Sequence, residues 1–386
     1  MSPPSRTPRA RRLDVDALLR DRHTRIVVCC GSGGVGKTTT AAALGLRAAE
    51  QGRRVVVLTI DPARRLAQSL GLVELDNTPR PVSGVDTSAG GSLDAMMLDM
   101  KRTFDEVVLA HARPEAAQQI LDNPFYQAVS SSFAGTQEYM AMEKLGQLRA
   151  QADREGTWDL VVVDTPPSRS ALDFLDAPKR LGSFLDGRFI RLISAPARVG
   201  GRASLRIFNV GIGLVAKTLT TVLGGQMLHD VQTFVSALDT MFGGFRERAD
   251  HTYALLKDAG TAFLVVAAAE RDALREASYF VARLAQDGMP PRGLVVNRLQ
   301  RVQAQELSAA RARAAAELLA ERGRRDSADA LALHAQLVEV QARQRNLVRR
   351  FSAGHTGIPV VEVAALPQDV HDLDGLREIG AALAAR

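Results

Sequence analysis

Residues 25–39 read RIVVCCGSGGVGKTT, and this stretch predicts a buried strand, a glycine-rich loop and the start of a helix. A short apolar run that ends in glycine is typical of a strand buried on both faces of a sheet. Residues 37–51 have helical character and end at Gly52. A strand, a tight loop and a helix in this order form the first unit of an α/β fold.

The loop itself matches the pattern G-x-x-x-x-G-K-[ST] in the context that the pattern requires, after a strand and before a helix. Glycines let backbone N–H groups turn inward around phosphates, and the helix N-terminus adds its positive dipole end. We expect Lys37 to reach the β- and γ-phosphates of ATP and the Thr38 hydroxyl to ligate Mg²⁺. The predicted nucleotide-binding residues of the loop are Gly31, Ser32, Gly33, Gly34, Val35, Gly36, Lys37, Thr38 and Thr39.

Further apolar runs without alternation are separated by helical segments. This pattern predicts a doubly wound, mostly parallel sheet covered by helices on both faces, which is the α/β fold of a P-loop NTPase with a helical insertion. The other predicted strands are 54–60, 158–164, 262–268, 293–297 and 359–363. The predicted helices include 61–70, 93–111, 136–152 and 271–286, and a long helical stretch covers 302–350.

Two aspartates, Asp61 and Asp164, lie where two of these predicted strands end. Ligands of open α/β sheets bind at the carboxyl ends of the strands, so both carboxylates are expected beside the loop. Asp164 would hold Mg²⁺ directly or through water, and Asp61 would orient or deprotonate the attacking water and contact the metal through water. An aspartate before Pro62 is also a common helix N-cap, which is the structural alternative for Asp61.

The domain prediction has three parts. Residues 1–22 form a disordered basic tail that is not a secretory signal, and residues 23–386 form one P-loop ATPase domain. Within it, residues 178–248 form a helical insertion with an amphipathic stripe from Met227 to Phe242 and a basic run before it. The stripe is either a groove for a hydrophobic client helix or a lipid-facing surface, or simply the core of a subdomain.

Composition narrows the classes of partner. The net charge of +6 is modest for 386 residues, and the aromatic content of 5% argues against stacking on nucleic acid. The two cysteines, Cys29 and Cys30, are neighbours in a strand, so they form neither a disulfide framework nor a zinc site. These features predict a cytoplasmic protein, with a peripheral position at the inner face of the membrane as an alternative.

Three motifs together resemble the ArsA group of deviant-Walker ATPases, which includes the arsenite-pump ATPase and the ATPase that targets tail-anchored membrane proteins. The motifs are the loop, the segment 61–66 (DPARRL) and the segment 164–172 (DTPPSRSAL). The resemblance implies that Asp61 activates water, that Asn297 contacts adenine and that Glu270 and the loop with Leu366 and Pro367 line the base. It also implies a homodimer, or a heterodimer with a paralogous ATPase, that opens and closes with the nucleotide state.

The chain departs from the family pattern in two respects. Ser32 stands where the family usually has a lysine that reaches the partner's phosphates, and Arg64, Arg65 and Arg169 are nearby candidates to replace its charge. The family's Cys-x-x-Cys zinc clasp and its arsenite-sensing cysteines are both missing from the sequence. Arsenite sensing by thiolates is therefore not expected.

Several functions remain open at this point. The chain could use ATP to bind a hydrophobic polypeptide or membrane partner, or energise an anion or efflux transport complex. It could also be a partition or positioning ATPase that acts on a membrane or DNA, where DNA binding would be steeply salt-dependent. A chain without the family's lysine could also be a binding subunit that needs a complementing partner to hydrolyse ATP.

Overall fold

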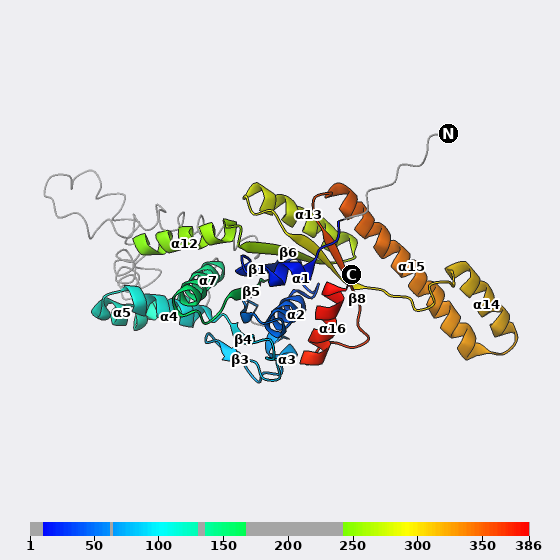
Figure 1. The fold of residues 1–386 in the computed structure, drawn as a ribbon, viewed down its shortest axis with the longest axis horizontal. Coiled ribbons are helices and arrows are strands. Elements are labelled where there is room, and N and C mark those ends of the chain that lie inside the picture. Colours follow the sequence, from blue (N-terminus) through cyan, green and yellow to red (C-terminus); the bar gives the residue numbers. More distant parts are fainter. Residues whose placement is uncertain (1–10, 62–64, 130–135, 167–241, 386) are drawn as a thin grey trace, which may run out of the picture. The chain divides into compact units, whose positions relative to one another are not determined.

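The computed structural model describes residues 11–61, 65–129, 136–166 and 242–385, and its described strands form one sheet. The sheet has 8 strands in the order β3-β4-β2-β5-β1-β6-β7-β8 (Figure 1). Neighbouring strands pair in parallel, except for β3 with β4. The bounds are β1 Ile26–Cys30, β2 Arg54–Thr59, β3 Arg80–Pro81, β4 Ser92–Met97, β5 Leu160–Asp164, β6 Thr261–Ala268, β7 Gly293–Leu299 and β8 Val360–Ala364. The predicted mostly parallel α/β fold is confirmed.

Helices cover both faces of this sheet. On one face, α2 (Lys37–Glu50), α16 (Leu373–Ala384) and α1 (Val15–Arg20) share a buried apolar cluster with alternate residues of the strands, such as Val27 and Val57. On the other face, α13 (Arg271–Gln286) packs against β6 and buries Phe280. Because both faces are covered, β1 and β5 are buried at every position and carry apolar residues in succession instead of alternating apolar and polar ones, with Asp164 at the end of β5 as the exception.

The strand β4 corrects the predicted helix over residues 93–111. Residues 92–97 are a strand paired in parallel with β2, and the helix α4 (Met100–His111) begins only after Asp99, whose side chain caps it by accepting from the Arg102 N–H. Leu93, Met96 and Met97 have helical spacing, yet a short apolar run does not distinguish helix from strand. Pairing with the exposed edge of β2 decides the outcome.

The N-terminal prediction is wrong for residues 11–22, which are ordered. Leu13, Val15 and Leu19 are buried in the main core, and the side chain of Asp14 caps α1 by accepting from the Ala17 N–H. Burial of these apolar side chains offsets the entropy of ordering the segment. Residues 1–10 of the predicted tail lie outside the described residues.

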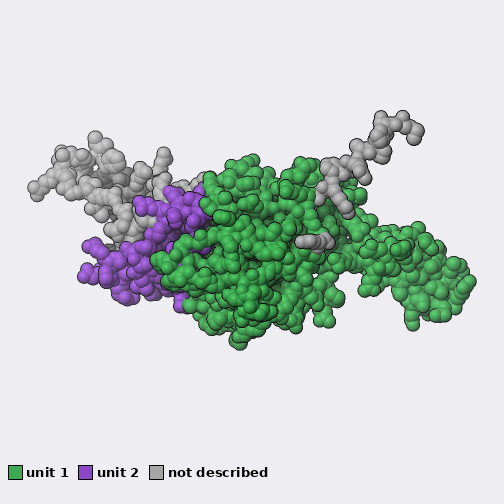
Figure 2. All heavy atoms as spheres, viewed as in Figure 1, with its two compact units in different colours: residues 1–97, 152–171, 256–386 green, residues 98–151, 172–255 purple. Residues whose placement is uncertain are grey.

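The chain divides into two compact units (Figure 2), whereas the sequence predicts a single domain with an insertion. Unit 1 holds the sheet, and unit 2 contains α4, α5 (Pro114–Leu121), α6 (Pro124–Val129) and most of α7 (Thr136–Glu155) and α12 (Phe242–Lys257). Within unit 2, Arg248 forms an ion pair of 2.9 Å with the buried Glu143. Residues 178–241 of the predicted insertion lie outside the described residues, and residues 242–248 begin α12.

A helical hairpin separates β7 from β8. The single long helical stretch expected over 302–350 is two helices, α14 (Ala309–Glu321) and α15 (Arg325–Gly354), which pack on each other (Figure 1). The turn between them contains Gly323 with a φ of 72°, a conformation that glycine adopts without strain. Alanine is the commonest residue of α14, and its buried residues are Ala312 and Ala316.

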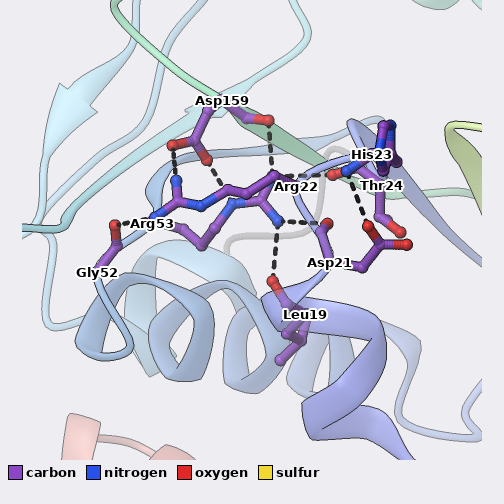
Figure 3. A network of polar contacts seen from close by, with 8 residues as sticks. All are labelled: Leu19, Asp21, Arg22, His23, Thr24, Gly52, Arg53 and Asp159. Carbon is purple, nitrogen blue, oxygen red and sulfur yellow. Dashed lines mark hydrogen bonds and ion pairs between the residues drawn. The ribbon is translucent and has the colours of Figure 1, made fainter.

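A buried arginine connects the amino ends of the central strands (Figure 3). Arg53 is 1% exposed, and its guanidinium donates to the carbonyl oxygens of Leu19 (2.8 Å), Thr24 (2.8 Å) and Asp159 (2.8 Å). It also donates to the Asp159 carboxylate at 2.5 Å and to the carbonyl oxygen of Asp21 at 3.1 Å. These contacts fix α1 and the starts of β1, β2 and β5 to one another.

The two cysteines of β1 are both buried and unpaired with each other. Cys29 is 0% exposed and Cys30 is 4% exposed. Burial raises the pKa of the Cys29 thiol far above its ordinary range and raises the pKa of Cys30 to about 12. Both thiols therefore stay protonated at neutral pH.

Candidate functional site

The glycine-rich loop connects β1 to α2, and at two of its positions there is no room for a side chain. At Gly31 (φ 152°), an added Cβ would lie 2.0 Å from the carbonyl oxygen of Val266 on β6. At Gly36 (φ 91°), it would lie 2.2 Å from the Asn297 side-chain nitrogen. The loop therefore packs closely against the backbone of Val266 on β6 and the side chain of Asn297 on β7.

Lys37 opens α2 and is only 7% exposed. Its Nζ donates to the carbonyl oxygen of Ser32 at 2.8 Å, so the lysine folds back over the loop. Burial lowers the pKa of Lys37, while the nearby carboxylates of Asp164 and Asp61 act in the opposite direction. A lysine ammonium held over a glycine-rich loop at a helix N-terminus is suited to a polyphosphate.

Asp164 ends β5 between β1 and β2, opposite Cys29 and Thr59. It is 0% exposed, and its Oδ2 accepts from the hydroxyls of Thr38 (2.7 Å) and Thr59 (2.9 Å). Its Oδ1 is buried and has no hydrogen-bond partner. An orphaned carboxylate oxygen beside a threonine hydroxyl fits Mg²⁺, which prefers oxygen ligands and would satisfy that atom.

Burial raises the pKa of Asp164 from its ordinary value of 3.8 to about 6, while the hydroxyls of Thr38 and Thr59 act to lower it. The folded protein therefore holds this proton at pH values where the unfolded chain has released it. Its contribution to stability is complete below about pH 4 and is lost as the pH rises to about 6. Above that pH, the buried carboxylate destabilises the metal-free fold.

Replacing Asp164 with Asn should raise the free energy of unfolding of the metal-free protein at pH 7, by up to about 3 kcal/mol. The amide keeps an acceptor for the two hydroxyls and carries no charge. Urea unfolding in a chelator at several pH values between 4 and 7 measures the effect. If the native protein and the variant lose stability equally over this interval, Asp164 is not the group responsible.

Asp61 follows β2 and lines the same pocket as Lys37 and Thr38. Its backbone N–H donates to the Thr59 hydroxyl at 3.3 Å, and that hydroxyl in turn donates to Asp164. The charge of the Asp61 carboxylate acts to raise the pKa values of both Asp164 and Lys37. Both aspartates named from the sequence therefore meet at the edge of the sheet where the loop lies.

The pocket has a volume of about 520 Å³ and lies entirely within unit 1. One wall is the loop and α2, a second is the end of β7 with Asn297, and a third is the segment 364–371 after β8. Leu366 lines the third wall, whereas Pro367 and Glu270 are exposed and are not among the lining residues. Glu270 is instead the N-cap residue of α13, without a side-chain capping bond.

Asn297 is buried and its amide contacts the loop directly. Its Nδ2 donates to the carbonyl oxygen of Val35 at 3.0 Å, and its Oδ1 accepts from the Arg298 N–H at 2.9 Å. The residue therefore connects the end of β7 to the loop, in addition to the role in base contact that the sequence resemblance implies.

Three residues have no role in the sequence motifs: Arg298 and Gln68, which line the pocket, and Thr59, which lies next to it. Thr59 bonds Asp164, Arg298 bonds the loop, and Gln68 lines the wall formed by α3 (Arg65–Ser69). The only sequence signal for Thr59 is its position at the end of the apolar run of β2. No local sequence pattern identifies Arg298 or Gln68. Of the arginines proposed to replace the missing lysine charge, Arg65 lines the pocket, while Arg64 and Arg169 lie outside the described residues.

Two further features are absent from the described residues. No group of three or more His, Cys, Asp or Glu side chains in the described ranges could hold a metal ion. Within the same ranges, no helix has the length and apolarity needed to cross a bilayer.

A parallel sheet with a phosphate-binding loop after its central strand β1, and with carboxylates at the ends of two neighbouring strands, defines the P-loop NTPase class. A family model described as anion-transporting ATPase (ArsA_ATPase) matches residues 24–321. The chain belongs to this ATPase family.

Curated relatives support the same assignment at modest identity. A putative arsenical pump-driving ATPase of Halobacterium salinarum is 30% identical over 197 residues, and Protein Rv2184c of Mycobacterium tuberculosis is 32% identical over 176 residues. These matches cover 48% and 42% of this chain but only 29% and 40% of those proteins, which is less than half of their length. ATPase GET3 of Malassezia globosa is 24% identical over 286 residues, covering 73% of this chain and 75% of that protein.

Proposed function

We propose that the chain binds ATP with Mg²⁺ at residues 31–39 and hydrolyses its γ-phosphate. The observation that carries this proposal is the orphaned Oδ1 of Asp164 beside the Thr38 hydroxyl, at the mouth of a glycine loop that ends in Lys37. This arrangement offers a metal site, a lysine charge and inward backbone donors at one strand edge.

Each residue of the site would have a distinct role in binding or hydrolysis. The loop N–H groups and Lys37 bind the β- and γ-phosphates, and Thr38 with Asp164 holds Mg²⁺, which neutralises charge on the phosphate oxygens. Asp61, partly exposed at the pocket, orients the attacking water and accepts its proton. Its backbone bond to Thr59 keeps it beside the metal site. Asn297 and Leu366, which both line the pocket, would contact the base.

Replacing Asp61 with Asn should leave ATP affinity within about threefold of the native value and lower turnover by about 10²-fold or more. The amide has nearly the same shape but cannot accept the proton. Calorimetric titration with ATP and a phosphate-release assay separate binding from turnover. Equal hydrolysis rates in the two proteins would remove Asp61 from the chemistry. Asp86→Asn, at an exposed aspartate that does not line the pocket, serves as the matched control.

We further propose that the nucleotide state controls a conformational change, through which the protein binds a hydrophobic polypeptide or a membrane partner. The active form would be a homodimer or a heterodimer with a paralogous ATPase. Support comes from family membership and from the amphipathic stripe in the sequence between Met227 and Phe242. The alternative, an energising subunit of an anion transport complex, is supported by the similarity to the putative arsenical pump-driving ATPase of H. salinarum. Purification of the Asp61→Asn variant with ATP, followed by identification of what co-purifies, distinguishes a client polypeptide from a membrane transporter.

A further inference from the structure

Arg298 has an unusual backbone conformation at the edge of the nucleotide pocket. Its φ is 58°, and within the described residues no other non-glycine residue has a positive φ. A side chain in this left-handed region is strained, and strain of this kind persists where the surrounding structure requires it. The pairing of β7 with β8 also shifts register between Val296 and Leu299, which bracket Arg298.

The strained backbone turns the side chain of Arg298 towards the phosphate loop. Its Nη1 donates to the carbonyl oxygen of Gly34 at 3.1 Å, while Asn297 donates to the carbonyl oxygen of Val35 at 3.0 Å. Two consecutive carbonyls of the loop are therefore held by two consecutive residues at the end of β7. The Arg298 N–H in turn donates to the Asn297 Oδ1, which fixes the orientation of that amide.

These outward bonds determine where the loop N–H groups point. A trans peptide is planar, so its C=O and its N–H point in opposite directions, and the described residues contain no cis peptide. A donor that holds the Gly34 carbonyl outward therefore directs the Val35 N–H towards the inside of the loop. The loop needs such a restraint because Gly34 (φ 74°) and Gly36 (φ 91°) allow its peptides to turn over at little cost.

We propose that Arg298 is a positioning residue for phosphate binding: it fixes the Gly34–Val35 peptide with its N–H directed at the β-phosphate of the bound nucleotide. The inference rests on the proposed function of the loop. Because ATP and ADP both carry a β-phosphate, loss of the restraint weakens both equally, whereas AMP is nearly unaffected. A loop ordered in advance also slows nucleotide release, since most affinity differences of this kind lie in the dissociation rate.

The test compares two substitutions at this position. Arg298→Met keeps the unbranched side chain and the backbone strain but removes the donor, and Arg298→Lys keeps one donor and the charge. We expect the Met variant to weaken ATP and ADP by the same factor, about tenfold, and AMP by less than about twofold, by competition against a fluorescent nucleotide. The Lys variant should recover most of the lost affinity.

Salt separates a hydrogen bond from a simple charge effect. The loss in the Met variant should persist between about 0.05 M and about 0.5 M NaCl, because a direct bond is screened little. A loss that vanishes at the higher salt, a loss confined to ATP, or an equal loss for AMP each overturns the proposal. If the Met variant fails to fold, Arg298→Gly is used instead, because glycine also lacks the donor and adopts a positive φ without strain. The Gly variant must then show the same equal loss for ATP and ADP and the same small loss for AMP.

A parallel measurement on Lys37→Ala keeps the two proposals distinguishable. If this variant binds ATP normally, the proposed function of the loop fails. If it loses binding while Arg298→Met keeps native affinity for both ATP and ADP, only the role of Arg298 fails.

Discussion

Replacing Lys37 with alanine should abolish measurable ATP hydrolysis, with a loss of about 10²- to 10³-fold or more in turnover. Lys37 is 7% exposed and its Nζ lies 2.8 Å from the Ser32 carbonyl oxygen, inside the loop that we propose binds the triphosphate. No other lysine lines the pocket in the described part of the chain. The buried ammonium is thus the only lysine charge there that could follow the γ-phosphate during transfer.

The measurement is steady-state phosphate release with saturating Mg²⁺ and ATP, together with the dissociation constant of ATP. Lys257→Ala is the control, because Lys257 is exposed near the end of α12 and does not line the pocket. Native turnover in the Lys37 variant would refute the site. The fold should survive the change, since alanine removes a buried charge whose partner carbonyl can reach water in the open pocket.

Replacing Arg53 with methionine should lower the free energy of unfolding by about 3–5 kcal/mol while leaving ATP affinity unchanged. The fully buried guanidinium makes hydrogen bonds to four backbone carbonyls, those of Leu19, Asp21, Thr24 and Asp159, and to the Asp159 carboxylate. Methionine fills a similar volume but leaves these buried acceptors without donors. Each unsatisfied buried group costs about 1–3 kcal/mol.

The matched control is Arg22→Met. Arg22 pairs with the same Asp159 carboxylate, but its side chain is 61% exposed, so its loss should cost less than about 1 kcal/mol. Denaturant unfolding of the two variants measures the difference. A similar cost at both positions would show that the backbone contacts of Arg53 contribute little. Arg53→Lys should recover only part of the stability, because one ammonium cannot reproduce the planar fork of donors.

The sequence predicts the strands well where both faces are buried. The runs 26–30, 55–58 and 160–163 are apolar throughout, because helices cover both faces of the sheet there. The prediction from sequence fails at β4, because Leu93, Met96 and Met97 fit a helical spacing and only pairing with β2 makes the segment a strand. The ordering of residues 11–22 could not be predicted from the local sequence either, since it depends on packing into the main core and on hydrogen bonds from Arg53 to the carbonyl oxygens of Leu19 and Asp21.

At the site, the phosphate loop and the two aspartates could be named in advance because their neighbours in sequence carry the signal. The glycines, Lys37 and Thr38 form one continuous motif, Asp164 ends β5 and Asp61 follows the end of β2. Contacts between distant segments carry no such signal. The bond from Arg298 to Gly34 joins residues 264 positions apart, and it follows from a backbone angle that no local pattern specifies.

The burial of Cys29 and Cys30 has a practical consequence for studying motion in this protein. Maleimide dyes react with thiolates at the surface, and both native sulfurs are shielded and protonated. A cysteine introduced at an open position such as Val73, which is 98% exposed, would become the single labelling point without removing either native one. Fluorescence or spin probes could then follow the nucleotide cycle in an otherwise unaltered chain.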